Sequence, residues 1–417
     1  MNEQKKKALI IGCGVAGPAV ALFLKRAGFE AEIFEARKMP EGFALSLSSN
    51  GVEVLKMLGL DGPVMAEGSP VTRGMMWNGK GKRLGEVPLA GEGQKSVFIK
   101  RVPLGMILAE EAERQGIKIE RGKKLESIEV TAAGGVVATF QDGTTARGDL
   151  LIGCDGVHSR TRQLIDPAFS GPVYTGLMNT GGYTSRVKVS SPPETTHFIF
   201  GKRAFFGYHV TPSGYIYWFT NYVQAEEPAR ETGEGGTHEE RKQRLLELFR
   251  DDQPFIREII GAAEETFPDF PSYALPTQPA SWHKGRVVLL GDAAHAISPS
   301  SGQGASMALE DAAVLAKCLR DISDLEQAFA TYERLRRARV ERMVQHGRSA
   351  GQGKVMTNPI QVWFRDSLAP LFLKLFANPS ALDWVYSYKV DWDEPVDARA
   401  SDPIVSQKDA SRVGVAK

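Results

Sequence analysis

Three glycines near the N-terminus form a pattern that could bind a dinucleotide. Gly12, Gly14 and Gly17 form a G-x-G-x-x-G sequence between an expected strand and an expected helix. The first glycine of such a pattern allows a tight turn, the second lets a pyrophosphate approach the backbone, and the third lets the helix pack on the strand. Glu35 ends the next expected strand, near the usual spacing of about 20 residues for an acid that binds ribose hydroxyls, and Arg37 follows as a further candidate. The pattern predicts a dinucleotide site without choosing between NAD and FAD.

Two later motifs favour FAD. An aspartate and a glycine in GCDGVHSR follow an apolar strand, and a second aspartate in GDAAH follows another strand, before a serine- and glycine-rich loop that opens a helix. An acid at a strand end can bind a ribityl hydroxyl, and the helix N-terminus can stabilise an anionic reduced flavin ring. The candidate cofactor-binding residues of these two motifs are Asp155, Gly156, Asp292, Pro299, Gly302 and Gly304.

A segment rich in aromatic residues could hold an organic substrate. We expect residues 204–222 to form a hairpin that turns at residues 212–214. Because side chains alternate between the faces of a strand, rings that share a face could form a roof over a flat, apolar molecule. The candidate substrate residues are Phe206, Tyr208, Tyr217 and Phe219.

Few side chains in these regions could act as acids, bases or nucleophiles. His209 is the only residue of the aromatic segment that titrates near neutral pH, and we expect it to pack rather than to act as a base. His295, Cys13 and Cys154 are also expected to be packing residues. No catalytic residue is therefore assigned. The three cysteines lack metal-ligand spacing and predict neither a metal site nor a disulfide framework.

Strands that are far apart in the sequence must position the motifs. Expected strands at 7–11, 31–34, 148–153 and 285–290 must share one sheet, although long stretches of chain separate them. Helices are expected at 15–27, 51–60, 104–115, 238–262, 305–319 and 325–348. The predicted fold class is α/β, with a Rossmann-like FAD-binding domain, an inserted, mainly β substrate domain and C-terminal helices.

A change of composition near residue 172 marks the start of the inserted domain, which is β-rich and aromatic. The final residues have little apolar content, which is typical of a loose tail. We therefore divide the chain into a discontinuous FAD-binding domain (1–171 with 281–345), a substrate domain (172–280), a C-terminal helical segment (346–395) and a tail (396–417).

The composition narrows the choice of partners and compartment. The chain has 51 Lys and Arg and 50 Asp and Glu, a formal net charge of +1, which gives no reason to expect a nucleic-acid partner. It lacks an apolar run of about 18 residues, so no transmembrane helix is expected. The low cysteine count predicts the cytoplasm. The apolar stretch 359–388 is expected to pack on the main domain rather than to anchor the protein at a membrane surface.

The three motifs, in this order and at these separations, resemble the class A flavoprotein monooxygenases, the family of para-hydroxybenzoate hydroxylase. The resemblance extends to about residue 345. It implies that the three glycines of the first motif and Glu35 hold the ADP part of FAD. It further implies that Asp155 and Gly156 serve both FAD and NAD(P)H, and that Asp292 binds the ribityl chain.

The same resemblance extends to the flavin ring. Arg101 matches an arginine of the family that contacts the flavin chain, and the loop from residue 299 to 304 matches the loop beside the isoalloxazine. Ser306 departs from the pattern, because many members carry Asn there, and this puts that flavin contact in doubt.

The resemblance implies an activity as well. Members of the family typically reduce FAD with NAD(P)H, form a C4a-hydroperoxyflavin with dioxygen and insert one oxygen atom into an organic substrate. The chain would then hydroxylate a small or polycyclic aromatic compound. Two alternatives stay open: an FAD-dependent dehydrogenase or reductase that inserts no oxygen, and a non-catalytic flavin-binding sensor. The substrate, the choice of NADH or NADPH, the type of oxygenation and the oligomeric state do not follow from the sequence.

Overall fold

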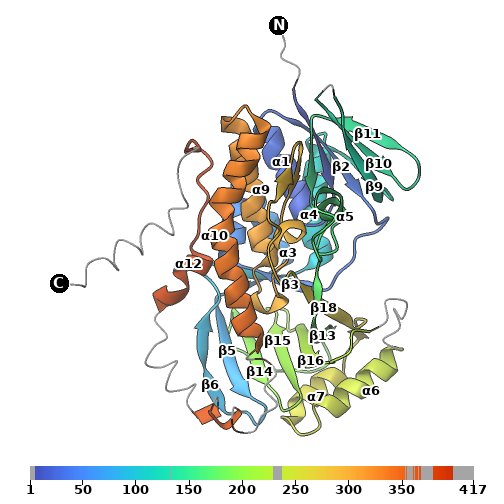
Figure 1. Cartoon of the computed structure of the whole chain (residues 1–417). Coiled ribbons are helices and arrows are strands. Elements are labelled where there is room, and N and C mark those ends of the chain that lie inside the picture. Colours follow the sequence, from blue (N-terminus) through green and yellow to red (C-terminus); the bar gives the residue numbers. More distant parts are fainter. Residues whose placement is uncertain are drawn as a thin grey trace, which may run out of the picture.

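Two large sheets with surrounding helices make up the molecule (Figure 1). The computed structural model describes residues 5–132, 134–228, 237–352 and 379–397, together with residues 354, 360, 362–364 and 366–367.

A six-stranded sheet carries the three motifs. Its strands are, in order, β19 (His283–Lys284), β20 (Val287–Leu289), β12 (Leu150–Gly153), β1 (Lys7–Ile11), β2 (Glu30–Glu35) and β8 (Lys118–Arg121). All neighbours are parallel except β19 and β20. The expectation that strands near residues 7, 31, 149 and 285 share one sheet is confirmed. Their ends meet, since Ile11 lies beside both Phe34 and Gly153, and Gly153 lies beside Leu289.

Helices pack around this sheet and position its motifs. The helix α1 (Ala16–Arg26) packs against α9 (Gly304–Asp321), which also packs against α2 (Ser49–Met57) and α10 (Leu325–Gln352). Most residues of α1 and α9 are buried, as expected for inner helices that are covered on several sides. The other helical elements are α3 (Asp61–Glu67), α4 (Arg101–Arg114), α5 (Arg160–Ile165), α8 (Asp292–His295) and η1 (Pro299–Ser301).

A three-stranded antiparallel sheet packs on the same unit. Its strands are β9 (Leu125–Val130), β10 (Val136–Phe140) and β11 (Thr145–Gly148). The ring of Phe140 contacts that of Phe34, with 4.7 Å between the ring centroids, and so continues the apolar core of the parallel sheet.

The second large sheet has eight strands, which are antiparallel to their neighbours except for one parallel pair, and we call it the antiparallel sheet. They are β17 (Glu265–Thr266), β13 (Val173–Thr184), β16 (Ile216–Val223), β15 (Ala204–Val210), β14 (Thr195–Phe200), β5 (Arg73–Asn78) and β6 (Arg83–Pro88), with β18 (Phe270–Ala274) paired to β13. The expected β-rich segment 172–280 thus lacks two strands of its own sheet, because β5 and β6 come from earlier in the chain. One face of the sheet packs against α6 (His238–Leu248) and α7 (Pro254–Gly261) and forms a second apolar core.

A small sheet joins the two large ones. It consists of β3 (Ala44–Leu47), β7 (Ser96–Lys100) and β4 (Ser69–Val71). The strand β7 continues directly into α4, and the Ser69 hydroxyl of β4 is hydrogen-bonded to His209 of β15. Figure 1 shows α10 as a long helix that runs from the side of the parallel sheet to the antiparallel sheet.

The described part of the C-terminal region packs on the parallel-sheet side. There α12 (Asp383–Tyr386) contacts α2, and the ring of Trp392 stacks on Phe23 of α1. The preceding η2 (Pro379–Leu382) instead contacts β6 of the eight-stranded sheet. Residues 398–417 of the expected tail, and most of the apolar stretch before residue 379, lie outside the described residues. None of the helices that the structure describes is long and apolar enough to cross a membrane.

Candidate functional site

The glycines of the first motif lie where β1 ends. Gly12 has a φ of 107°, and a Cβ there would lie 2.4 Å from the carbonyl oxygen of Cys154. A Cβ on Gly17 would lie 1.9 Å from the Gly12 carbonyl oxygen. A Cβ on Gly14 would meet no atom of the described chain within 4 Å. Close packing therefore requires the outer two glycines, whereas Gly14 leaves open space in which a pyrophosphate could approach the backbone.

Glu35 lies directly beside this turn. Its two carboxylate oxygens accept hydrogen bonds from the backbone N–H groups of Cys13 and Arg37, each at 2.7 Å. A carboxylate oxygen can accept more than one hydrogen bond, so Glu35 keeps capacity for ribose hydroxyls. The guanidinium of Arg37 is exposed and pairs with Glu41 at 3.2 Å. Arg37 thus contributes its backbone to the turn, while its side chain belongs to the surface.

Asp155 lies at the same edge of the sheet, but its side chain forms hydrogen bonds within the protein. Its carboxylate accepts hydrogen bonds from the Ser159 hydroxyl at 2.5 Å and from the Thr161 backbone N–H at 2.8 Å. Gly156, with a φ of 77°, makes the turn between the strand and α5. Burial raises the pKa of Asp155. The second motif therefore shapes a rigid turn at the sheet edge.

Arg162 ties the second motif to the third. Its buried guanidinium donates hydrogen bonds to the carbonyl oxygens of Val157 and Ala293, at 2.6 and 2.8 Å. Sequence reasoning did not single out this residue, because an arginine three residues into a short helix is usually solvent-exposed.

Asp292 is the acid of the third motif, and its carboxylate is open to a ligand. None of the described residues donates a hydrogen bond to it, although the residue is half-buried and burial raises its pKa. His295 and Arg101 are the main groups that oppose this shift. A Cβ on Gly304 would lie 3.8 Å from Asp292 Oδ1, so the carboxylate faces the start of α9. An acceptor with free capacity beside an open helix N-terminus fits the ribityl chain and flavin of FAD.

Hydrogen bonds to the start of α2 hold the loop from Pro299 to Gly304 in place. Gly302 adopts the left-handed conformation, with a φ of 65°. The buried Gln303 side chain donates a hydrogen bond to the Ser48 hydroxyl at 2.8 Å and accepts one from Asn50 at 3.2 Å. Ser306 accepts the Ser48 backbone N–H at 3.1 Å. Ser306 thus connects α9 to the start of α2, a role that the sequence did not suggest.

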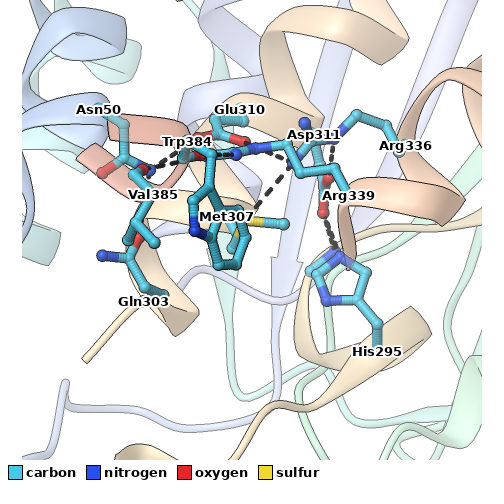
Figure 2. A network of polar contacts seen from close by, with 11 residues as sticks. Asn50, His295, Gln303, Met307, Glu310, Asp311, Arg336, Arg339, Trp384 and Val385 are labelled. Atoms are coloured by element: carbon cyan, nitrogen blue, oxygen red, sulfur yellow. Dashed lines mark hydrogen bonds and ion pairs between the residues drawn. The ribbon is translucent and has the colours of Figure 1, made fainter. Parts of the chain in front are cut away.

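Figure 2 shows a buried network of charged groups, to which the Asn50 partner of Gln303 also belongs. Arg336 bridges Glu310 and Asp311, with N–O distances of 2.7 Å to each, and Arg339 forms two 2.8 Å hydrogen bonds to Glu310. All four side chains are fully buried. Although burial opposes it, the pairing with Arg339 and Arg336 holds the pKa of Glu310 below its usual value.

The network also fixes the third motif. Asp311 accepts hydrogen bonds from His295 Nε2 at 2.5 Å and from the Gly291 backbone N–H at 3.2 Å. Arg339 donates to the carbonyl oxygens of Trp384 and Val385, which ties α12 to the same network. Sequence analysis placed His295 as a packing residue and read residues 325–348 only as a helix. The missed signal was a Glu–Asp pair between the apolar runs 307–309 and 312–316 of α9, together with two arginines three residues apart in α10.

The antiparallel sheet presents a different set of rings from those expected. In the hairpin of β15 and β16, Gly207 pairs with Phe219 and His209 pairs with Tyr217. Directly opposed residues share a face, so Tyr217 and Phe219 lie on one face while Phe206 and Tyr208 lie on the other. Phe206 and Tyr208 are buried in the core against α6 and α7. Both side chains therefore belong to this core rather than to an open surface, and the location does not support their expected role as substrate residues.

Phe219 forms the centre of the other face. A Cβ on Gly207 would lie 2.2 Å from the Phe219 ring, so glycine is required for the ring to lie across the neighbouring strand. The centroid of Phe205 is 6.0 Å from that of Phe219. Phe219 and Tyr217 are half-buried, whereas Phe205 is buried. We call Phe205, Tyr217 and Phe219 the aromatic face.

His209 lies at the end of this face as a packing residue. Its ring stacks on Phe98 with 5.2 Å between centroids, and its Nε2 is 2.7 Å from the Ser69 hydroxyl oxygen. Burial lowers its pKa to about 4, so the imidazole is neutral at pH 7. This location agrees with the expectation that His209 packs rather than acts as a base.

Comparisons with known proteins give a consistent assignment. A family model described as an FAD binding domain matches residues 5–347. The aurachin C monooxygenase/isomerase of Stigmatella aurantiaca is 31% identical, over 86% of this chain and 92% of the relative. The FAD-dependent urate hydroxylase of Mycolicibacterium vanbaalenii is also 31% identical, over 82% of this chain and 87% of the relative. The structure of Klebsiella pneumoniae HpxO complexed with FAD and uric acid aligns with a TM-score of 0.79 and 25% identity, over 90% of this chain and 96% of that one. These relatives do not favour a reductase or a sensor.

Proposed function

Because the chain belongs to the para-hydroxybenzoate hydroxylase-like family of FAD-dependent monooxygenases, we propose that it uses NAD(P)H and dioxygen to hydroxylate a planar aromatic or heterocyclic compound. The observation that carries this proposal is the edge of the parallel sheet. There the open space at Gly14, the Glu35 carboxylate and the Asp292 carboxylate lie at or just beyond the ends of β1, β2 and β20, three strands of the same sheet.

The chain's residues have separate roles in holding the cofactor. The turn at Gly14 and the N-terminus of α1 would bind the pyrophosphate. Glu35 would accept hydrogen bonds from the adenosine ribose, and Asp292 from the ribityl chain. Arg101, which lies close enough to Asp292 to oppose the rise in its pKa, would contact the same chain. Gly302 and Gly304 would let the flavin ring lie close to the backbone at the start of α9.

Bound FAD would supply the redox chemistry, in which NAD(P)H provides two electrons and dioxygen provides one atom to the product and one to water. The chain's part is to orient the substrate and to exclude water. Buried side chains such as His209 and Gln303 form hydrogen bonds within the protein, which fix their orientation. No proton transfer by these two residues is required.

The aromatic face would hold the substrate flat. Phe219 and Tyr217 offer ring surface that the protein itself leaves half-exposed, and stacking on such rings is favourable for a planar molecule. Two of the proteins to which the chain is similar are named for urate or uric acid, a planar heterocycle. This supports a heterocyclic or aromatic substrate of similar shape.

The proposal is tested by screening planar ring compounds, uric acid among them, with the FAD-loaded protein. A substrate should accelerate NAD(P)H oxidation and should consume one dioxygen for each NAD(P)H. A compound that accelerates NAD(P)H oxidation equally well without oxygen would instead indicate a reductase. A protein that retains FAD but oxidises NAD(P)H at one slow rate with every compound would contradict the proposal.

A further inference from the structure

Lys354 lies two residues after the last residue of α10, near the place where this helix packs on the loop of the third motif. A Cβ on Gly351 would lie 3.4 Å from the Ser300 hydroxyl oxygen, and a Cβ on Gly347 would lie 3.2 Å from Ser301 Cβ. The Lys354 backbone N–H donates to the carbonyl oxygen of Gly351 at 3.1 Å. The backbone of Lys354 is therefore close to the loop that we assign to the flavin.

The side chain of Lys354 reaches from there to the aromatic face. Its Nζ lies 4.6 Å from the ring centroid of Phe205 and 3.3 Å from Asn221 Oδ1. The Asn221 side chain is itself oriented by a 2.6 Å hydrogen bond to Asn179. Lys354 thus spans the space between the loop and the sheet, which is where a substrate must lie to meet the flavin.

The charge of the Lys354 ammonium group is not paired within the described part of the chain. None of the described carboxylates forms an ion pair with it, and the hydrogen bond to Asn221 uses one of its three donors. Enclosure by the protein lowers the pKa of Lys354 to about 8, which still leaves the amine mostly protonated at pH 7. Burying a cation without an anion costs free energy. By contrast, the buried guanidinium groups of Arg336 and Arg339 each form an ion pair with a buried carboxylate. This difference indicates that a bound ligand supplies an anion to Lys354.

We propose that Lys354 is a substrate-binding residue that selects ring compounds with an acidic hydroxyl group and binds the oxygen as its anion. This inference rests on the proposed function. In the binding step the substrate O–H bond breaks, and the proton passes to water or, when the amine is neutral, to Lys354 Nζ. Both routes give the same pair of ammonium and oxyanion. The negative charge enriches the ring carbons in electrons, which favours their attack on an electrophilic oxygen.

A purely structural role would be different. In that case Lys354 would only clamp the end of α10 to Asn221 and Phe205, and its charge would not affect which ligand binds. Binding of two probes that differ only in the acidic proton separates the two roles, and it requires no turnover.

The probes are 4-nitrophenol, whose phenolate absorbs visible light, and 4-nitroanisole, its methyl ether. The FAD-loaded wild type should bind 4-nitrophenol as the phenolate and at least about tenfold more tightly than the ether, a difference of about 1.4 kcal/mol. Lys354→Met should abolish this preference, whereas Lys354→Arg should retain most of it. Lys202→Met is the matched control, because Lys202 is exposed and pairs with Asp251 on the same sheet domain.

FAD content and thermal unfolding of each variant show whether it is folded. A wild type that binds both probes equally or binds neither, or a folded Lys354→Met that keeps the full preference, would overturn the proposal. A wild type without FAD would instead contradict the proposed function itself.

Discussion

The two large sheets differ in the structural features that would form their proposed binding sites. At the edge of the parallel sheet, the shape of the proposed cofactor site depends mainly on the backbone, because contacts with neighbouring backbone atoms require glycine at Gly12 and Gly17. On the antiparallel sheet, side-chain rings form the surface, and strand register decides which of them face the ligand. A backbone that requires glycine at fixed positions produces a recognisable sequence motif, whereas strand register produces none. The sequence therefore predicts the proposed cofactor site but not which side chains form the proposed substrate site.

The largest expected effect concerns the buried network of charged groups in α9 and α10. Arg336→Met leaves Glu310 and Asp311 buried with an uncompensated charge, which should lower the free energy of unfolding by about 3–5 kcal/mol. The control is Arg337→Met, because Arg337 is partly exposed and pairs with Glu333 on the helix surface. Urea denaturation would measure both. Equal, small losses of about 1 kcal/mol or less would show that the buried network is not a major source of stability.

The two faces of the aromatic hairpin can be compared directly. Phe206→Ala removes a core ring and should cost about 3–5 kcal/mol of stability, with little change in the substrate's half-saturation concentration. Phe219→Ala should show the opposite pattern, because its ring is half-exposed on the aromatic face. Denaturation and steady-state kinetics of the two variants test this. A rise in half-saturation for Phe206→Ala alone would reverse our assignment of the faces.

This pair of residues also shows where sequence reasoning stopped. Alternation within one strand correctly groups Phe206 with Tyr208, and Tyr217 with Phe219. Alternation does not predict whether the pair Phe206 and Tyr208 lies on the same face of the sheet as the pair Tyr217 and Phe219. That depends on the residues joined across the turn, here Val210 and Ile216, and so on the conformation of the loop between them.

Other features could not be predicted from the sequence because they depend on contacts between residues far apart in the chain. The strands β5 and β6 join a sheet formed mostly by residues after 172, and long-range pairing leaves no local pattern. Lys354 and Phe205 meet only because α10 ends beside that sheet. By contrast, the six-stranded sheet and the positions of its motifs followed from the sequence, because each motif lies directly after its own strand.

The acids of the cofactor side should have moderate effects. Glu35→Ala and Asp292→Ala each remove a charged hydrogen-bond acceptor, worth about 1.5–3 kcal/mol, and should weaken FAD binding by about ten- to a hundredfold. Glu41→Ala is the control, since Glu41 pairs with Arg37 on the surface. Fluorescence titration of the apoprotein with FAD gives the three affinities. An unchanged affinity in either site variant would remove that acid from the site.

His209 should have the smallest effect on turnover. His209→Gln keeps a polar side chain and should cost less than tenfold, or about 1.4 kcal/mol of barrier. The reason is that burial lowers the pKa of His209, which makes it a weak base, and that both ring nitrogens are hydrogen-bonded within the protein. Its pKa of about 4 when folded lies below its ordinary value of 6.5, so between these values the unfolded chain binds a proton that the folded one does not. The stability contributed by neutral His209 is therefore full above pH 6.5 and is lost as the pH falls towards 4.

Unfolding free energies of wild type and His209→Gln over this pH range give the measurement. The variant should lose less stability on acidification than the wild type. A hundredfold loss of turnover with a flattened pH profile would show that His209 is a catalytic base after all.

We propose that the two sheets together serve one reaction, the transfer of an oxygen atom to a ring that is held beside the flavin. Turnover of an identified substrate under labelled dioxygen in ordinary water, and under ordinary dioxygen in labelled water, tests this most directly by mass spectrometry of the product. We predict one labelled oxygen atom in the product in the first experiment and none in the second. Label that enters only from water, or a product without added oxygen, would contradict the account.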